Sequence, residues 1–415
     1  MTASMTRADS GTMSARNLRY LDDHFDRHIA SGKLAGTITV VFHRDQITHW
    51  SAQGLRDRER GMPMTDDTIF RIYSMTKPIV SVALMQLYER GLFQLDDPVS
   101  KYIPSWQNLR VYAGGTYPNF QTTPCERPMT VRDLLSHQAG LTAPASDGTH
   151  VDAAYRQVGI GSKIGRTTVG STLQDLVDAL AELPLDYSPG TGWLYSSSVD
   201  IVGYLVEQLS GQRLDTYLQE HIFEPLGMTD SGFWVQPHQV NRLATNYRGV
   251  KGGGVEIVDD LEKSPYLTEP TFHSGSGGLV STAGDYLRFS RMLLGKGTLD
   301  GQRIIGRKTL GLMAQNHITG GKTIAQAATA ARWREVSRQG VGFGLGFAVA
   351  LDSADSQVTD SPGSYYWAGA ASTHFWIDPT EDLAVVFMTQ YMSTLPETRL
   401  NIARELRAIV YGALD

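Results

Sequence analysis

Cysteine is almost absent from this 415-residue sequence, which contains Cys125 alone. A single cysteine excludes an internal disulfide and a zinc site built from cysteine thiolates. Basic runs are absent too, and the formal net charge is −6. Nothing in the charge pattern therefore favours nucleic acid as a partner.

Long apolar runs are also missing. No stretch is long enough to span a bilayer, and residues 1–16 are polar and lack the apolar segment of a secretion signal. We therefore expect a cytoplasmic protein without a membrane partner. The sequence contains no Gly-x-Ser-x-Gly, so an α/β-hydrolase nucleophile is not supported. No phosphate-binding, nicotinamide-binding or metal-binding motif is complete, and we predict no cofactor and no metal.

The composition is that of an ordinary globular protein, with 41% hydrophobic and 19% charged residues. Its length exceeds the usual size of a single core, which predicts two lobes or one domain with a large insertion. Short β-rich runs lie near both chain ends: residues 37–43 and 47–54 as a hairpin, then 343–350, 364–367, 373–377 and 384–389. An amphipathic helix is expected after Ser14, and another over residues 396–414.

These patterns predict an α+β fold. An antiparallel sheet would form from both ends of the chain, flanked by the N- and C-terminal helices. Residues 1–95 and 314–415 would make up this α/β lobe, and residues 96–313 an inserted, mostly helical lobe. The active site is expected in the cleft between the two lobes.

Three further features of the sequence concern the expected loops and helices. Residues 146–170 and 248–264 are rich in glycine and are expected to be loops beside the cleft. Ser171 and Gln174 match a capping box for the helix that follows them. His24 and His28 lie one turn apart on the first helix, but no third ligand is near them in the sequence. We interpret this pair as a solvated helix edge rather than a metal site.

The residues 70–78, Phe-Arg-Ile-Tyr-Ser-Met-Thr-Lys-Pro, carry the strongest functional signal. They place Ser74 three residues before Lys77 in the expected first turn of a long helix, so the hydroxyl and the amine share a face. The helix N-terminus favours developing negative charge and a neutral lysine. Because a serine hydroxyl needs a neighbouring base, we interpret Ser74 as a nucleophile. A serine cap followed by an exposed lysine is the alternative interpretation of this spacing alone.

Two later segments could complete such a site. Tyr195 lies between a turn and the next helix, where its phenol could share with Lys77 the transfer of the serine proton. Trp367-Ala368-Gly369-Ala370 is expected on a strand whose small residues allow a substrate to lie close. Taken singly, the tyrosine is better explained as a packed loop aromatic and the tryptophan as a buried residue beside a β-bulge.

Together, Ser74-Met75-Thr76-Lys77, Tyr195-Ser196-Ser197 and Trp367-Ala368-Gly369 resemble the serine β-lactamase and penicillin-binding-protein superfamily. The resemblance is closer to the family VIII carboxylesterases, which share the class C β-lactamase fold, and it covers roughly residues 18–411. It implies a β-lactamase-like fold, catalysis by Ser74, Lys77 and Tyr195, and an oxyanion hole from the Ser74 and Ala370 N–H groups.

Two departures from the lactamase pattern indicate the substrate. Trp367 stands where lactamases have the lysine of Lys-Thr-Gly, and losing that cation weakens recognition of an anionic substrate. Ser197 stands where they usually have asparagine, which affects amide recognition. With Trp367, Gly369, Ala370 and Ser197 as substrate-binding residues, we predict hydrolysis of short-chain esters through an acyl-enzyme, with weak activity on cephalosporins.

Three alternatives remain open. A β-lactamase or D-Ala-D-Ala peptidase would act outside the cytoplasm, and the expected leader is missing. A serine acyltransferase would use an alcohol instead of water as the acyl acceptor. A non-catalytic binding protein on the same scaffold is expected to have lost Ser74, Lys77 or Tyr195, and all three are present.

Overall fold

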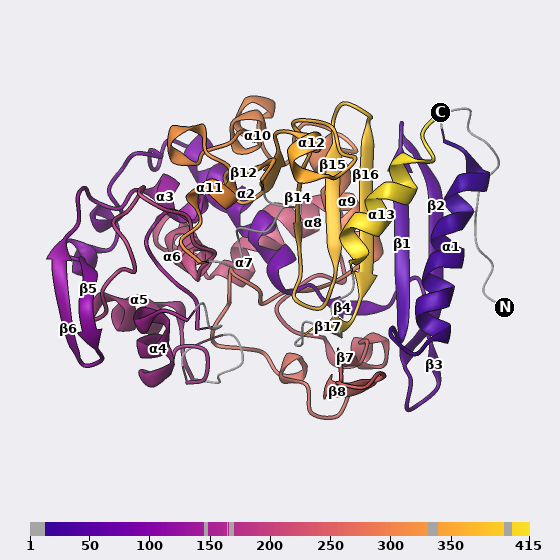
Figure 1. The fold of residues 1–415 in the computed structure, drawn as a ribbon, viewed down its shortest axis with the longest axis horizontal. Coiled ribbons are helices and arrows are strands. Elements are labelled where there is room, and N and C mark those ends of the chain that lie inside the picture. Colours follow the sequence, from indigo (N-terminus) through magenta and orange to yellow (C-terminus); the bar gives the residue numbers. More distant parts are fainter. Residues whose placement is uncertain (1–12, 145–147, 164, 166–169, 331–338, 394–400) are drawn as a thin grey trace.

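The computed structural model describes residues 13–144, 148–163, 165, 170–330, 339–393 and 401–415. Its largest element is an eight-stranded antiparallel sheet in the order β12-β13-β14-β15-β16-β1-β2-β3. From one edge to the other, these strands are Val341–Phe343, Ala348–Ala350, Tyr365–Ala368, His374–Asp378, Leu383–Thr389, Gly36–His43, Gln46–Asp57 and Met62–Pro63. The two ends of the chain meet where β1 pairs with β16 (Figure 1).

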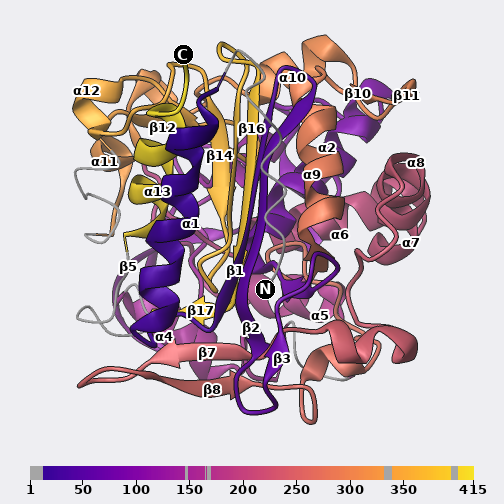
Figure 2. The ribbon, with the colours of Figure 1, turned by 90° about the vertical axis from the view of Figure 1, so that its right-hand side faces the viewer.

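Helices cover both faces of this sheet, which explains why every residue of β1 and β16 is buried. α1 (Ala15–Ala30) and α13 (Ile402–Tyr411) lie on one face, and α9 (Ala283–Leu294) packs on the other (Figure 2). α1 begins where the Ser14 hydroxyl accepts the Asn17 N–H. The predicted α+β architecture, a β-lactamase-like sheet between terminal helices, is confirmed.

The rest of the chain is mostly helical and lies to one side of the sheet (Figure 1). α2 (Thr76–Glu89) packs there against α6 (Ser198–Ser210). The other helices are α3 (Val131–Leu135), α4 (His150–Gln157), α5 (Leu173–Ala181), α7 (Leu214–Leu218), α8 (Glu224–Leu226), α10 (Arg307–Met313), α11 (Ile324–Ala327) and α12 (Ser353–Ser356). A hairpin of β5 (Arg110–Thr116) and β6 (Asn119–Pro124) projects from this part. The lobe boundaries at residues 95 and 314 stay a prediction.

The expected loop over residues 146–170 is partly wrong, because it contains α4. The Thr149 side chain caps this helix by accepting the Asp152 N–H, and Val151 and Tyr155 are buried anchors. The expected capping box was also misplaced by one residue. Thr172 and Asp175 form it, each side chain accepting the other's backbone N–H.

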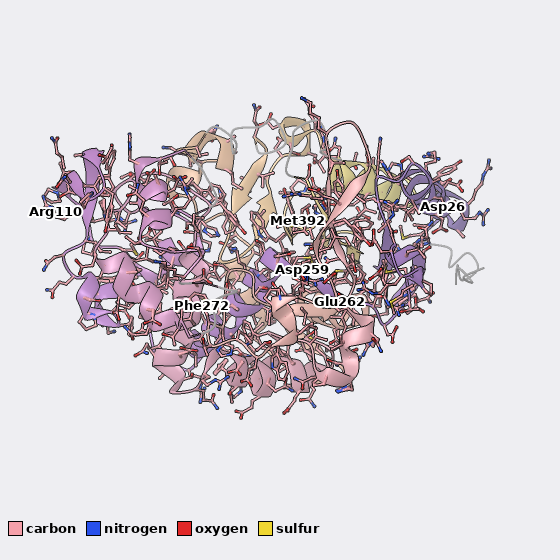
Figure 3. All side chains as sticks on the ribbon, turned by 90° about the horizontal axis from the view of Figure 1, so that it is seen from below. Asp26, Arg110, Asp259, Glu262, Phe272 and Met392 are labelled. Carbon is pink, nitrogen blue, oxygen red and sulfur yellow. The ribbon has the colours of Figure 1, made fainter. Side chains whose placement is uncertain are left out.

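The second expected loop, residues 248–264, is wrong over its first part. It carries most of a hairpin between β7 (Asn246–Gly249) and β8 (Val255–Asp259), which β17 (Tyr391–Met392) extends in parallel. Seen from below, Asp259 and Met392 of this small sheet lie between Asp26 at one end of the molecule and Arg110 at the other (Figure 3). The remaining two-stranded sheets pair β4 (Ile69–Arg71) with β9 (Val280–Thr282), and β10 (Thr298–Leu299) with β11 (Gln302–Arg303).

The sequence predicts no third ligand near His24 and His28, and this prediction is wrong because the fold brings one to them. Glu405 of α13 lies beside both, with its Oε2 atom 3.2 Å from Nε2 of His24 and 3.8 Å from Nε2 of His28. The helix pairing that brings them together joins residues 381 positions apart, so sequence spacing could not show it.

Two further expectations concern the end of the chain and membranes. The C-terminal helix is described from Ile402, whereas residues 396–400 of its predicted range lie outside the described residues. Within the described part of the chain, none of the helices combines the length and apolar character needed to cross a bilayer. A cytoplasmic location stays a prediction.

Candidate active site

Ser74 lies in a 3₁₀ turn, Tyr73–Met75, between β4 and α2. It therefore precedes the α-helix proper, which begins at Thr76 rather than at the nucleophile as expected. Tyr73 has a φ of 45°, a left-handed conformation that costs a bulky residue about 1–3 kcal/mol. Its hydroxyl accepts a hydrogen bond from Asn246 Nδ2 at 2.9 Å. This contact helps to hold the strained turn that presents Ser74.

The strand before the turn is anchored by Arg71, whose side chain is fully buried. Its guanidinium donates to Asp259 Oδ2 of β8 at 2.6 Å and to the Ala244 carbonyl at 2.5 Å. Removing one partner of a buried ion pair strongly destabilises a folded protein. Arg71 therefore holds this strand firmly to β8. The β7–β8 segment is thus tied through Arg71 to the strand that precedes the nucleophile, and its expected place beside the cleft stays a prediction.

Lys77 points back from α2 toward Ser74, as the three-residue spacing predicts. Its side chain is buried, and Nζ lies 3.5 Å from Ser74 Oγ and donates to the Ser276 carbonyl at 2.7 Å. Nζ also lies 4.5 Å from the centre of the Tyr195 ring. The amine is thus held between the nucleophile and the phenol, excluded from bulk water.

Tyr195 completes the cluster from the segment before α6. Its hydroxyl lies 2.7 Å from Ser74 Oγ, within hydrogen-bond distance. Trp367 of β14 donates its indole N–H to the same phenol oxygen at 3.4 Å, and the two rings lie 5.3 Å apart. The structure therefore brings Ser74, Lys77, Tyr195 and Trp367 into one cluster.

Gly369 lies beside the nucleophile segment, and Ala370 follows it in the turn after β14. A Cβ on Gly369 would lie 2.5 Å from the Ile72 carbonyl oxygen, so only glycine allows the turn after β14 to approach this closely. The Gly369 N–H already donates to the Thr373 carbonyl at 2.8 Å. Ala370, whose N–H is the predicted oxyanion donor, is exposed on this turn, and its role stays a prediction.

A cavity of about 520 Å³ adjoins the cluster. Its wall includes Ser197 and Ser276, and Ser276 is the residue whose carbonyl holds Lys77. Apolar side chains of Ile160 and Phe272 form part of the same wall. Ser197 thus lines a cavity that meets the cluster at Ser276, the residue that holds Lys77, and not at Ser74 itself.

Asp200 is a site residue that the sequence reasoning missed. Its buried carboxylate accepts from Ser276 N–H at 2.9 Å and from the Ser274 hydroxyl at 2.7 Å. It thereby fixes the loop that offers its carbonyl to Lys77. In the sequence, Asp200 is only an acidic residue in a first helical turn, where the helix dipole favours it, and no spacing links it to Ser276.

His137 was missed as well, although it lies directly behind Tyr195. Its ring is 4.9 Å from the Tyr195 ring, and its Nδ1 accepts the Ser196 N–H at 3.3 Å. Complete burial, together with the charge of Lys77, lowers the pKa of His137 well below its usual value. This histidine is therefore a neutral support that positions the Tyr195 segment.

The family model named Beta-lactamase matches residues 21–409 of the chain, which is nearly its whole length. The chain belongs to the Beta-lactamase family. The described geometry agrees with that assignment, since the Ser74, Lys77 and Tyr195 motifs that suggested it converge in space.

Individual proteins that resemble the chain add detail. The chain is 34% identical to the uncharacterized protein MT1414 of Mycobacterium tuberculosis, covering 88% of each chain. It is 29% identical to esterase EstB of Burkholderia gladioli, covering 97% of this chain and 96% of that one. Its fold matches EstCE1, described as a hydrolase with promiscuous acyltransferase activity, with a TM-score of 0.79, 26% identity and coverage of 95% and 98%. The comparisons support a serine hydrolase of this family with esterase relatives.

Proposed function

We propose that this chain is a serine carboxylesterase that hydrolyses short-chain esters through an acyl-enzyme on Ser74. One observation carries the proposal: the Tyr195 phenol oxygen lies 2.7 Å, and Lys77 Nζ 3.5 Å, from the Ser74 hydroxyl oxygen. A hydroxyl flanked by two groups that can exchange its proton is the arrangement that activated serine nucleophiles need.

In the first half of the reaction, Ser74 Oγ attacks the ester carbonyl carbon and its proton passes to the Tyr195–Lys77 pair. The carbonyl oxygen becomes an oxyanion that the Ser74 and Ala370 N–H groups stabilise. The tetrahedral adduct then collapses, the C–O bond to the alcohol breaks, and the pair returns the proton to the departing alkoxide. The second half repeats these steps with water in place of Ser74, releasing the acid and free enzyme.

The wall of the site supports neutral esters as substrates. Trp367 supplies an apolar, hydrogen-bonded surface where a lysine would supply a fixed charge. Arg156 lines the neighbouring cavity, but its guanidinium is paired with the Asp152 carboxylate at 3.0 Å. The cavity of about 520 Å³ has room for an acyl or alcohol group, and the described residues of its wall offer no unpaired arginine to an anionic substrate.

Acyl transfer is a second candidate function, because EstCE1 carries out both reactions according to its description. The two reactions share the acyl-enzyme and differ only in whether water or an alcohol accepts the acyl group. A transferase would form a new ester when an alcohol is added and would hydrolyse the acyl donor slowly without it.

The test follows adduct mass and product release for wild type and Ser74→Ala with p-nitrophenyl acetate, p-nitrophenyl octanoate and a cephalosporin. We expect turnover of the acetate, slower turnover of the octanoate, a trapped or slowly released cephalosporin adduct, and a loss of at least about 10³-fold in Ser74→Ala. Faster turnover of the cephalosporin would favour a β-lactamase. Activity that survives in Ser74→Ala would refute the nucleophile.

A further inference from the structure

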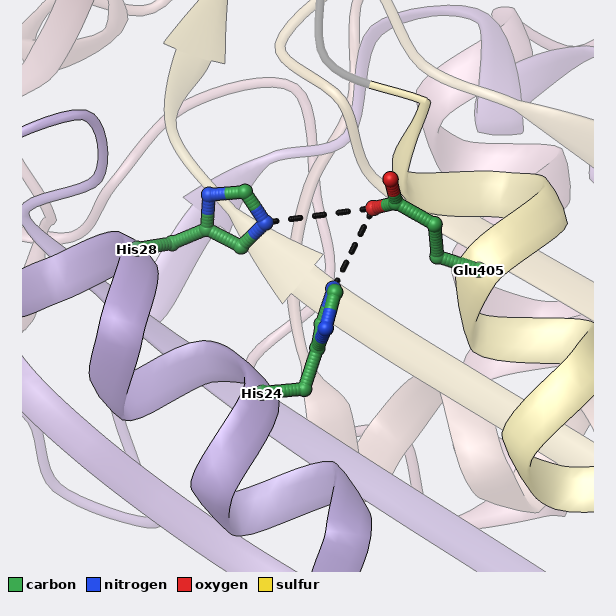
Figure 4. A group of neighbouring side chains, drawn as sticks. All are labelled: His24, His28 and Glu405. Carbon is green, nitrogen blue, oxygen red and sulfur yellow. Dashed lines mark hydrogen bonds and ion pairs between the residues drawn. The ribbon is translucent and has the colours of Figure 1, made fainter.

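Three side chains outside the active site converge between the first and last helices. His24 and His28 project from the same side of α1, and Glu405 projects toward them from α13 (Figure 4). Their potential ligand atoms all lie within 4.8 Å of one another. Residues four apart on a helix share a face, so both imidazoles point toward the same place beside α1.

We propose that His24, His28 and Glu405 bind one divalent transition-metal ion of the zinc type. The ligand set of two imidazoles and one carboxylate is one that Zn²⁺ commonly takes, with water in the fourth position. This site would be additional to the proposed esterase chemistry and would not depend on it.

The spacing of the ligand atoms fits a tetrahedral ion. Bonds of the usual zinc lengths place two ligand atoms about 3.4 Å apart across a tetrahedron. In the structure, the Glu405 Oε2 atom lies 3.2 Å from His24 Nε2 and 3.8 Å from His28 Nε2. The His24 and His28 rings lie 4.8 Å apart, nearly perpendicular at 77°. A small change in the imidazole rotamers would bring all three atoms to bonding distance.

The site is also accessible and held on rigid elements. The two histidine side chains are 15% and 17% exposed, and that of Glu405 is 39% exposed, so an ion can enter without opening the core. Neighbouring Phe25 is fully buried and stacks on Phe387 of the sheet at 4.7 Å, which fixes the register of α1. The first helix therefore presents its ligands from a fixed position.

A bound ion would join the two ends of the chain. α1 and α13 run antiparallel, and at one end of the pair Ser14 N–H already donates to the Ala413 carbonyl at 2.7 Å. The His–Glu cluster lies toward the other end, near the start of α13. Metal binding there would oppose separation of the terminal helices from the sheet, because an ion that binds the native state alone stabilises it.

The experiment uses untagged, chelator-treated protein, because a polyhistidine tag would bind the same ions. Isothermal titration with Zn²⁺ should show one ion per chain, and Co²⁺ should give the visible absorption of a low-symmetry site with nitrogen ligands. At about 100 times the dissociation constant, Zn²⁺ should raise Tm by roughly 2–5 °C. Mg²⁺ prefers oxygen ligands, so it should give no heat of binding and no increase in Tm.

Three variants, His24→Ala, His28→Ala and Glu405→Gln, should each lose the heat of binding and the Tm increase while retaining ester hydrolysis. The matched control is His238→Ala, which removes an exposed histidine outside the cluster and should bind Zn²⁺ as wild type does. Glu405→Gln keeps the shape of the side chain, so it remains informative if a histidine variant fails to fold. No binding by wild type, or binding that survives in all three variants, would overturn the proposal.

Discussion

The phenol oxygen of Tyr195 lies 2.7 Å from the hydroxyl oxygen of Ser74, although 121 residues separate them in the chain. Lys77, by contrast, is a neighbour in sequence and lies 3.5 Å away. The nucleophile therefore has one partner that comes from the local helix and one that only the packing of α6 against α2 provides. Substitutions at each partner and at the residues that support it separate their contributions to catalysis.

Tyr195→Phe removes the phenol oxygen and keeps the ring that covers Lys77. We expect kcat/KM for p-nitrophenyl acetate to fall by about 10²–10⁴-fold, the usual contribution of a proton-transfer group, with Tm nearly unchanged. Tyr20→Phe is the control, because that tyrosine is 51% exposed and lies on α1. If Tyr195→Phe keeps activity within about threefold of wild type, Tyr195 does not carry the serine proton.

Trp367→Lys introduces the cation that the β-lactamase pattern has at this position, whereas Trp367→Phe keeps an aromatic wall. We expect the ratio of kcat/KM for a cephalosporin to that for an ester to rise about tenfold in the lysine variant, because a charge-assisted hydrogen bond to a carboxylate becomes available. Steady-state kinetics on both substrates measure the ratio. An equal rise in the phenylalanine variant would show that size, and not charge, sets the preference.

Asp200 acts through Ser276 on Lys77, so we expect it to be a positioning residue. Asp200→Ala should lower kcat by about tenfold or more with a smaller change in KM, because the Ser276 carbonyl no longer holds the Lys77 amine in place. Asp200→Asn keeps an acceptor oxygen and should recover most of the loss. A rise in KM with kcat unchanged would instead place Asp200 in direct contact with the substrate.

Gly369→Ala would place a methyl group against the Ile72 carbonyl, two residues before the nucleophile. We expect a loss of about 1–3 kcal/mol in the free energy of unfolding, together with reduced kcat, as the turn and the Ser74 segment move apart. Gly311→Ala is the matched control, since a methyl group there meets no atom within 4 Å and lies in a helix. It should leave activity unchanged and stability equal or slightly higher.

The Asp285 carboxyl makes the free energy of unfolding depend on pH. Burial raises the pKa of its carboxyl to about 6. Between about pH 4 and 6 the native state therefore holds a proton that the unfolded chain releases, and the contribution of this group to the free energy of unfolding falls as pH rises. Asp285→Asn should remove that fall.

The corresponding measurement is urea unfolding of wild type and Asp285→Asn from about pH 4.5 to about pH 7.5. The stability of the variant relative to wild type should increase with pH over this range, by up to about 3 kcal/mol. Asp23→Asn, at an exposed position on α1, serves as the control and should show no such trend. A constant difference between wild type and Asp285→Asn would contradict a raised pKa.

The sequence by itself determined the elements whose signal is local. Periodic apolar residues predicted the terminal helices, two β-rich runs joined by a turn predicted the β1–β2 hairpin, and the three-residue spacing placed Lys77 beside Ser74. Where the signal was weak, as in α4 with its few apolar anchors or β8 in a glycine-rich segment, the prediction of a loop failed. The β-rich runs near both chain ends also predicted that these ends share one antiparallel sheet, and the pairing of β1 with β16 confirms it.

Only the tertiary structure decided contacts between residues far apart in the chain. Asp200 reaches Lys77 through Ser276, and Glu405 meets His24 across two helices, because packing and not sequence distance sets which side chains are neighbours. Burial is likewise a property of the whole fold, which is why the lowered pKa of His137 has no signature in the residues around it. Spacing within one helix is fixed by the backbone hydrogen bonds of that helix, whereas an encounter between helices depends on every surface packed in between.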